Sequence, residues 1–180
     1  MSKQIEIRLT GSGGQGLILG GIILAEAAIL DGNNAVQSQS YGPEARGGAS
    51  KAEVIISKDE IDFTKVEIPD LTLALTQVAF DKYADEIKED GIILVDSGIV
   101  IPEHFTAGKV IQIPILETAA NVLKKPMVAN IIAMGAIQAL IGAVTKESLE
   151  AAVLSRVPKG TEELNRKALN EGYKLIESTK

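Results

Sequence analysis

The sequence has 180 residues, of which 46% are hydrophobic and 3% aromatic, and this size predicts one hydrophobic core and a single domain over residues 1–180. Its formal net charge of -6 at pH 7 argues against a general nucleic-acid binder, because neutralising phosphates requires clustered lysine and arginine. The chain has no cysteine, so it forms no disulfide and holds no iron–sulfur cluster through thiolates.

The N-terminal segment leads directly into an alternating strand and lacks the basic and apolar regions of a secretory signal. The longest apolar run, Gly16 to Ala25, is interrupted by Glu26 and is shorter than the ~20 residues that span a bilayer. We therefore expect a cytoplasmic protein that does not insert into a membrane.

Apolar strand-like runs alternate with helical segments along the chain. We expect strands at 4–10, 34–40, 51–57, 71–75, 91–96 and 109–114. We expect helices at 14–31, 77–88, 116–124, 127–142, 146–156 and 161–178. This alternation predicts an α/β fold, a three-layer Rossmann-like sandwich whose twisted sheet is mostly parallel and carries helices on both faces. Because no helix separates the strand at 51–57 from the preceding one, we expect it to pair antiparallel at one edge.

Three of the helices carry informative local signals. Thr145 and Thr161 stand where N-caps are expected, each before an amphipathic stretch. The segment ANIIAMGAIQALIG at 129–142 is apolar nearly all round, so it is either a central buried helix or one that faces a partner chain.

A glycine-rich loop joins the first strand to the first helix. Gly11, Gly13 and Gly16 match G-x-G-x-x-G between a strand and a helix, a context in which backbone N–H groups can bind a phosphate or another anion. The candidate residues of this loop are Gly11, Ser12, Gly13, Gly14, Gln15 and Gly16. An equally weighted alternative is that Gly16, Gly20 and Gly21 only let the helix lie close to the sheet.

The end of the second strand bears on which anion this loop binds. A dinucleotide dehydrogenase needs an acidic residue there to hold the adenosine ribose. The sequence instead has Ser38, Gln39 and Ser40, and Asp31 lies before the strand. The pattern therefore weakens an NAD-binding interpretation.

A second flexible loop follows that strand and reads SQSYGPEARGGAS at 38–50. Because ligands gather at the carboxyl ends of the strands in an open sheet, we expect Arg46 to lie near the glycine loop and to bind phosphate or carboxylate. The alternative is a solvated charge or an ion pair with a carboxylate such as Glu44. The candidate residues of this loop are Ser40, Tyr41, Gly42, Pro43, Glu44, Arg46, Gly47 and Gly48.

Other polar residues predict a rim around the same crevice but no catalytic site. Gln77 and Asp96 follow two later strands, and Asp96 is expected to cap a turn. Asn130 is expected either to reach the crevice or to bond between helices. The single histidine, His104, has no second ligand at metal spacing and is expected at the surface. We predict no catalytic residue, no metal ligand and no cofactor bound by this chain alone.

Four segments are distinctive in combination: GSGGQG at 11–16, SQSYGPEARGGAS at 38–50, AEVIIS at 52–57 and VPKGTEELNRKAL at 157–169. Together they resemble the gamma subunit of the 2-oxoacid:ferredoxin oxidoreductases, and the resemblance extends over essentially the whole chain. Within that family the chain is most similar to the 2-oxoglutarate type.

The resemblance implies a subunit of a complex that oxidatively decarboxylates a 2-oxoacid, forms an acyl-CoA (succinyl-CoA for 2-oxoglutarate) and reduces ferredoxin. It implies alpha, beta and possible delta partner subunits, which carry thiamine diphosphate, magnesium and [4Fe-4S] clusters. Coenzyme A is the co-substrate, and this chain is expected to support assembly and the coenzyme A entrance. For the isolated chain two states stay open, a monomer and a homodimer that forms through apolar surfaces normally covered by the partner subunits.

Two further hypotheses remain open from the sequence. The chain could be a stand-alone nucleotide-binding Rossmann-like protein, which the literal glycine motif favours and the missing ribose acid opposes. It could also be a purely structural interaction module whose glycines serve packing only. Tight binding of NAD, FAD or ATP by the lone chain would support the first of these.

Overall fold

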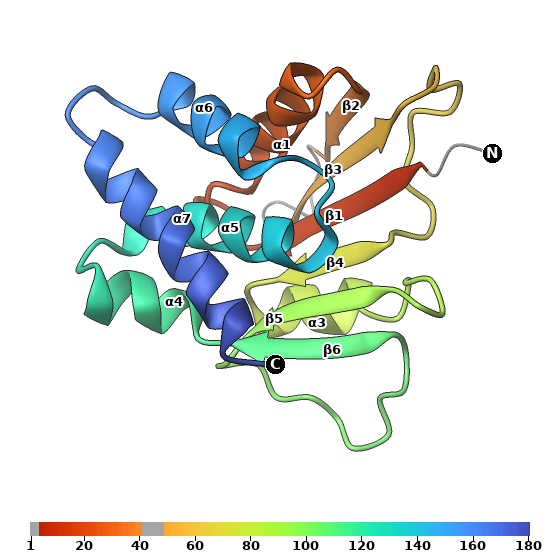
Figure 1. Cartoon of the computed structure of the whole chain (residues 1–180). Coiled ribbons are helices and arrows are strands. Elements are labelled where there is room, and N and C mark those ends of the chain that lie inside the picture. Colours follow the sequence, from red (N-terminus) through yellow and green to blue (C-terminus); the bar gives the residue numbers. More distant parts are fainter. Residues whose placement is uncertain (1–3, 41–48) are drawn as a thin grey trace.

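The computed structural model describes residues 4–40 and 49–180, which are built around one six-stranded sheet (Figure 1). The strands are β1 (Ile5–Gly11), β2 (Asn34–Gln39), β3 (Ser50–Ser57), β4 (Leu71–Ala74), β5 (Ile92–Asp96) and β6 (Lys109–Ile113). The main helices are α1 (Leu17–Leu30), α3 (Gln77–Tyr83), α5 (Ala129–Ile141), α6 (Lys146–Arg156) and α7 (Glu162–Glu177). The short α4 (Ile115–Glu117) continues as the wider turn Thr118–Val122, and a single tight turn covers Pro126–Val128.

The strand order is β2-β3-β1-β4-β5-β6. The pairs β1–β4, β4–β5 and β5–β6 are parallel, whereas β3 is antiparallel to both β1 and β2. The predicted α/β class and the antiparallel region at one edge are confirmed. The reversed strand β3 itself lies one position inside that edge, because β2 pairs along its outer side.

The two faces of the sheet are covered unequally. Helices α1, α5, α6 and α7 pack on one face and build the larger apolar core, whereas α3 and the loop before β6 build a smaller core on the other (Figure 1). The alternation along β1 shows this division, since Ile7 and Leu9 belong to the larger core while the neighbouring Arg8 and Thr10 are buried without joining it. The predicted helical layers on both faces are therefore confirmed.

Helix α5 is the central helix of the larger core. Its residues from Ala129 to Ile137 are all buried, and α7 packs directly against it. Of the two alternatives for this apolar segment, the structure bears out the buried helix. Within residues 4–40 and 49–180, no helix is long and apolar enough to cross a membrane.

The predicted bounds of α6 and α7 hold to within one residue, whereas α1 begins at Leu17 instead of residue 14 and the helix expected at 116–124 is the short α4 with its wider turn. Helix α3 ends at Tyr83, well before the expected residue 88, because the chain turns there through Ala84 toward the loop before β5. Thr145 caps α6 as predicted, with its Oγ1 accepting from the Ser148 N–H at 3.2 Å. Thr161 does occupy the N-cap position of α7, but its hydroxyl donates to the Pro158 carbonyl instead of capping the helix, so that part of the prediction is wrong.

Asp31 joins the end of α1 to the start of α6. Its carboxylate accepts the Thr145 N–H at 2.7 Å, the Thr145 hydroxyl at 2.8 Å and the Ser148 hydroxyl. Burial raises the pKa of Asp31, but the hydrogen bonds from Ser148 and Thr145 outweigh burial, so the pKa lies below its ordinary value of 3.8.

We expect Asp31→Asn to lower the free energy of unfolding by about 1 kcal/mol near neutral pH, because the charged acceptor of three donors is lost. A carboxyl whose folded pKa is depressed stabilises the fold above its unfolded pKa and loses this effect as the pH falls through the folded value. The difference between wild type and variant should therefore shrink below pH 3.8 in urea unfolding. The exposed Glu89→Gln is the control, and a difference that persists in acid would contradict the linkage.

Candidate functional site: the glycine loop at the start of α1

The glycine loop lies open at the carboxyl end of β1. Gly13 and Gly14 are exposed, and a Cβ added at either would meet no atom within 4 Å. Gly14 and Gly16 have φ values of +83° and +74°, which L side chains rarely adopt. The Gln15 side chain closes the turn from within, since its Oε1 accepts the Ser12 N–H at 2.8 Å. Gln15 therefore shapes the loop, and Gly13 and Gly14 form its accessible surface.

The loop opens into the N-terminus of α1, which begins at Leu17 without a side-chain cap from the described residues. The uncapped N–H groups of a first helical turn carry partial positive charge and favour an anion or a hydrogen-bond acceptor. Asn130 holds the loop from α5, because its Nδ2 donates to the Gly16 carbonyl at 3.2 Å while its Oδ1 accepts the Ile131 N–H at 2.9 Å. Asn130 thus bonds between elements, which was one of its two predicted roles.

Packing explains only part of the glycine pattern. A Cβ at Gly20 would lie 3.1 Å from Cε of Met134, and one at Gly21 would lie 3.3 Å from Cγ of Gln37, so these glycines do let α1 approach the sheet and α5. Gly11 is confined in the same way by Gln15. Gly13 has open space beside it and no positive φ, so neither packing nor strain requires a glycine there.

The second predicted loop falls mostly outside the described residues. This applies to Tyr41, Gly42, Pro43, Glu44, Arg46, Gly47 and Gly48. The residues on either side are described: the Ser40 N–H donates to the Lys51 carbonyl at 3.1 Å, and Ser50 is paired with Gly11. The chain therefore leaves and re-enters the sheet beside the glycine loop, and the role of Arg46 stays a prediction.

The predicted polar rim is occupied by internal hydrogen bonds. Asp96 caps its turn as expected, with its two carboxylate oxygens accepting the Gly98 and Leu116 N–H groups at 2.9 and 2.8 Å. The Gln77 amide bonds both the N–H and the carbonyl of Val100, at 2.8 and 3.1 Å. These side chains fix the loop after β5, and the open part of the crevice is the glycine loop.

Sequence reasoning missed a buried charge network on the other face of the sheet. Arg8 Nε donates to Glu53 at 2.9 Å and Nη1 to Glu86 at 2.8 Å, while Nη2 bonds the carbonyls of Val66 and Glu67. The signal was a charged residue inside the apolar alternation IEIRLTG of β1. No group of three or more His, Asp or Glu side chains suited to a metal ion occurs in residues 4–40 and 49–180.

Comparison with known proteins gives consistent relatives over nearly the full length. The sequence model of the family described as pyruvate ferredoxin/flavodoxin oxidoreductase matches residues 6–175. A relative named 2-oxoglutarate synthase subunit KorC, from Methanocaldococcus jannaschii, is 53% identical over 173 residues, which cover 94% of this chain and 92% of the relative. The protein of the same name from Methanothermobacter marburgensis is 45% identical, covering 95% of this chain and 96% of that one.

A solved structure shares the fold as well as the sequence. The crystal structure of the keto/oxoacid ferredoxin oxidoreductase gamma subunit from Geobacter sulfurreducens is 52% identical, with a TM-score of 0.87, and the match covers 97% of this chain and 99% of that one. This chain, which has the glycine loop and no cysteine, therefore matches that gamma subunit over almost its whole length. The chain belongs to the pyruvate ferredoxin/flavodoxin oxidoreductase family.

Proposed function

We propose that this chain is the gamma-type subunit of a multi-subunit 2-oxoglutarate:ferredoxin oxidoreductase. The complex would convert 2-oxoglutarate, coenzyme A and two oxidised ferredoxins into succinyl-CoA, carbon dioxide, a proton and two reduced ferredoxins. The observation that carries this proposal is the match to 2-oxoglutarate synthase subunits over more than nine-tenths of both chains. A stand-alone nucleotide-binding protein is not favoured by relatives that are named as subunits.

Within that complex we assign this chain a binding role and no acid–base step. It acts as a single domain in the cytoplasm, with alpha and beta subunits, and a delta subunit where one exists, as its partners. Those subunits carry thiamine diphosphate, magnesium and the [4Fe-4S] clusters, for which this chain offers no cysteine ligand. The open amides at Gly13 and Gly14, together with Arg46, receive an anionic part of coenzyme A or an acidic group of a partner subunit.

Gly13→Val tests the glycine loop directly. A Cβ at Gly13 would meet no atom within 4 Å and the residue is exposed, so the free energy of unfolding should stay within about 0.5 kcal/mol of wild type. The valine side chain covers the approach to the loop amides. We therefore expect one of two affinities to weaken about tenfold: that of the reconstituted complex for coenzyme A, or that of this chain for its partner subunits.

The matched control is Ala151→Val, which adds comparable bulk on the exposed side of α6. Arg46→Ala tests the second loop in the same assays. If Gly13→Val assembles and binds coenzyme A like wild type, the loop is not a binding surface and its glycines serve packing alone. If the purified wild-type chain forms no complex with thiamine-dependent subunits, the proposed function is wrong.

A further inference from the structure

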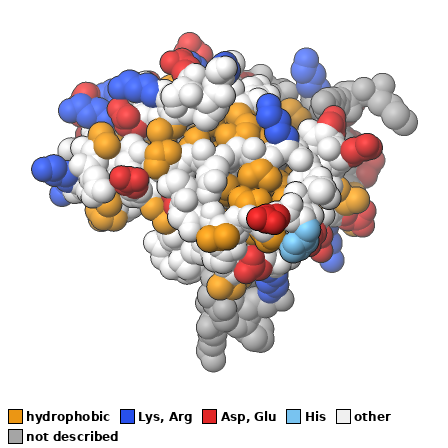
Figure 2. Space-filling model, turned by 90° about the horizontal axis from the view of Figure 1, so that it is seen from below, with side chains coloured by type: hydrophobic (Ala, Val, Ile, Leu, Met, Phe, Trp, Pro, Cys, Tyr) orange, Lys and Arg blue, Asp and Glu red, His pale blue; other side chains and the backbone are white. Residues whose placement is uncertain are grey.

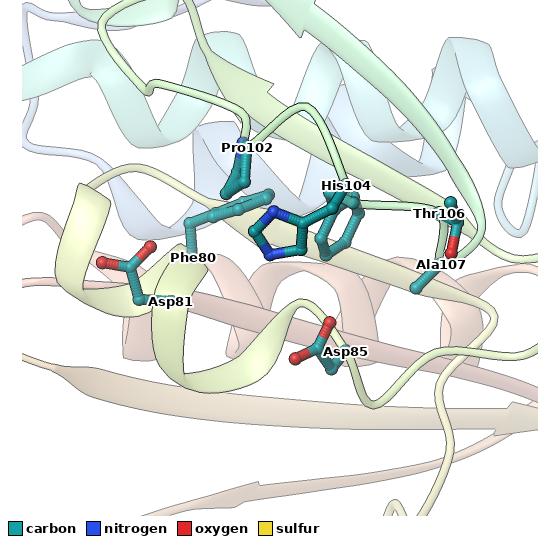
Figure 3. Close-up of a pocket in the computed structure, with 8 residues that line it drawn as sticks. Phe80, Asp81, Asp85, Pro102, His104, Thr106 and Ala107 are labelled. Carbon is teal, nitrogen blue, oxygen red and sulfur yellow. The ribbon is translucent and has the colours of Figure 1, made fainter.

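A pocket of about 320 Å³ lies between α3 and the loop 97–108, on the sheet face opposite the four-helix layer. Phe80 and Phe105 form its apolar floor, with ring centroids 5.0 Å apart. Asp81 on α3 and Asp85 in the turn that follows α3 line one side, and His104 faces them from the loop (Figure 3). The pocket thus combines aromatic surface with carboxylates.

The pocket is held in shape by the protein. The Gln77 amide bonds both backbone groups of Val100 and so fixes the loop to the start of α3. The same Gln77 Nε2 donates to Asp81 Oδ1 at 2.9 Å, which fixes that carboxylate at the rim. A site with this support needs little rearrangement to accept an occupant.

The charges at this place are strongly negative. Residues 77–108 contain seven Asp or Glu and two Lys, in a chain whose total formal charge is -6. Lys88 is bound to Asp70, so it does not neutralise the rim. Asp85 is exposed, and its carboxylate forms no hydrogen bond or ion pair with the residues that the structure describes, although its backbone carbonyl accepts the Ile87 N–H. Phosphates and carboxylates are therefore repelled from this pocket, whereas cations are attracted.

Exposed apolar side chains adjoin the pocket. Val78 on α3 is 51% exposed and Val100 on the loop is 73% exposed. Seen from this side, apolar side chains gather next to the histidine, with acidic side chains beside them (Figure 2). An apolar patch with a charged recess next to it is typical of a protein–protein contact, and a metal ion alone would not use it.

We propose that α3 and the loop 97–108 form a docking surface for a partner subunit that inserts an arginine or lysine side chain between Asp81 and Asp85. The stem or guanidinium plane of that residue packs on Phe80 and Phe105, and its charge meets the two carboxylates. The partner's neighbouring apolar residues cover Val78 and Val100. This inference rests on the proposed function, which supplies the partner chains, and adds a contact with them at a second place, away from the glycine loop.

The single histidine of the chain gives a direct test, because His104 is exposed at the pocket rim and diethyl pyrocarbonate is a reagent that modifies exposed imidazoles. The labelling rate of His104 is measured by mass spectrometry in the free full-length chain and in the complex with coexpressed alpha and beta subunits. We expect at least a tenfold slower rate in the complex. The double variant Asp81→Asn/Asp85→Asn should bind the partner subunits about tenfold more weakly in a subunit-titration assay.

The matched control is Glu147→Gln/Glu163→Gln, which removes two exposed carboxylates from the opposite layer and should bind like wild type. If the complex forms but His104 is labelled at the free rate, the docking surface is wrong while the proposed function stands. If His104 is protected but the Asp81→Asn/Asp85→Asn variant binds normally, no basic side chain is anchored there. If no complex forms, both proposals fail.

Discussion

Replacing Arg8 with methionine is expected to lower the free energy of unfolding by about 3–5 kcal/mol, because the buried carboxylate of Glu53 loses its main positive partner. Arg8 is 2% exposed and Glu53 7% exposed, and their side chains are 2.9 Å apart. Lys51 lies 3.3 Å from the same Glu53 oxygen but is less deeply buried, so it compensates only in part. The variant also leaves the Val66 and Glu67 carbonyls without their donor, which loosens the loop before β4.

This effect is measured by urea unfolding followed by circular dichroism at neutral pH. The control is Arg156→Met, which removes an exposed arginine bound to Glu26 at 2.7 Å and should change stability by less than about 1 kcal/mol. The double variant Arg8→Met/Glu53→Met should recover much of the loss, because an apolar pair replaces an unpaired buried carboxylate. Equal effects of Arg8→Met and Arg156→Met would contradict the buried network.

The second large effect is expected where α5 and α7 touch. A Cβ at Gly172 would meet the Ala136 nitrogen at 2.7 Å and the Gly135 Cα at 3.0 Å, and it would overlap the Ile132 carbonyl. These atoms belong to backbone, which cannot turn aside as a side chain can. Alanine favours a helix over glycine by about 1 kcal/mol, but the clash forces the helices apart. We expect Gly172→Ala to lower the free energy of unfolding by about 2–3 kcal/mol.

Gly20→Ala is the matched control for this substitution. It also adds a methyl group to a helical glycine facing the core, but its nearest neighbours are the Met134 side chain at 3.1 and 3.3 Å and a Leu9 methyl at 3.5 Å. A flexible methionine can move, so the propensity gain and the packing cost should nearly cancel. The stabilities of the two variants are compared by thermal unfolding. A Gly172→Ala protein as stable as the Gly20→Ala protein would contradict the close contact between α5 and α7.

Much of the fold could be predicted from the sequence because local patterns determine it. The antiparallel pairing of the strand at 51–57 is confirmed, and the sequence predicted it because no helical pattern stands between this strand and the one before it. The limit of α3 was not predictable, because its apolar spacing continues past Tyr83 while the chain leaves the helix for the next strand. Arg8 reads as an ordinary strand residue, and its partners stand 45 and 78 positions away in the sequence.

The candidate site, too, was predictable from the sequence only in part. The strand–glycine–helix motif placed the loop correctly, since that signal is local. The packing around the backbone distinguishes these glycines: Gly20 and Gly21 are required where α1 lies close to its neighbours, whereas packing requires no glycine at position 13. The pocket at His104 had no sequence signal, because the residue was rightly expected at the surface and the facing carboxylates come from another element.

The position of α5 has a consequence for synthesis of the chain on the ribosome. Strands β1 and β4 present their apolar side to this helix, yet its residues, 129–141, are translated long after both strands, and α7 follows later still. A nascent chain that has reached β6 therefore carries a sheet whose larger apolar face is covered by α1 but not yet by α5, α6 and α7. Such an intermediate is a natural client for chaperones, and ribosome-stalled chains released before residue 141 should aggregate, whereas those extended through α7 should not.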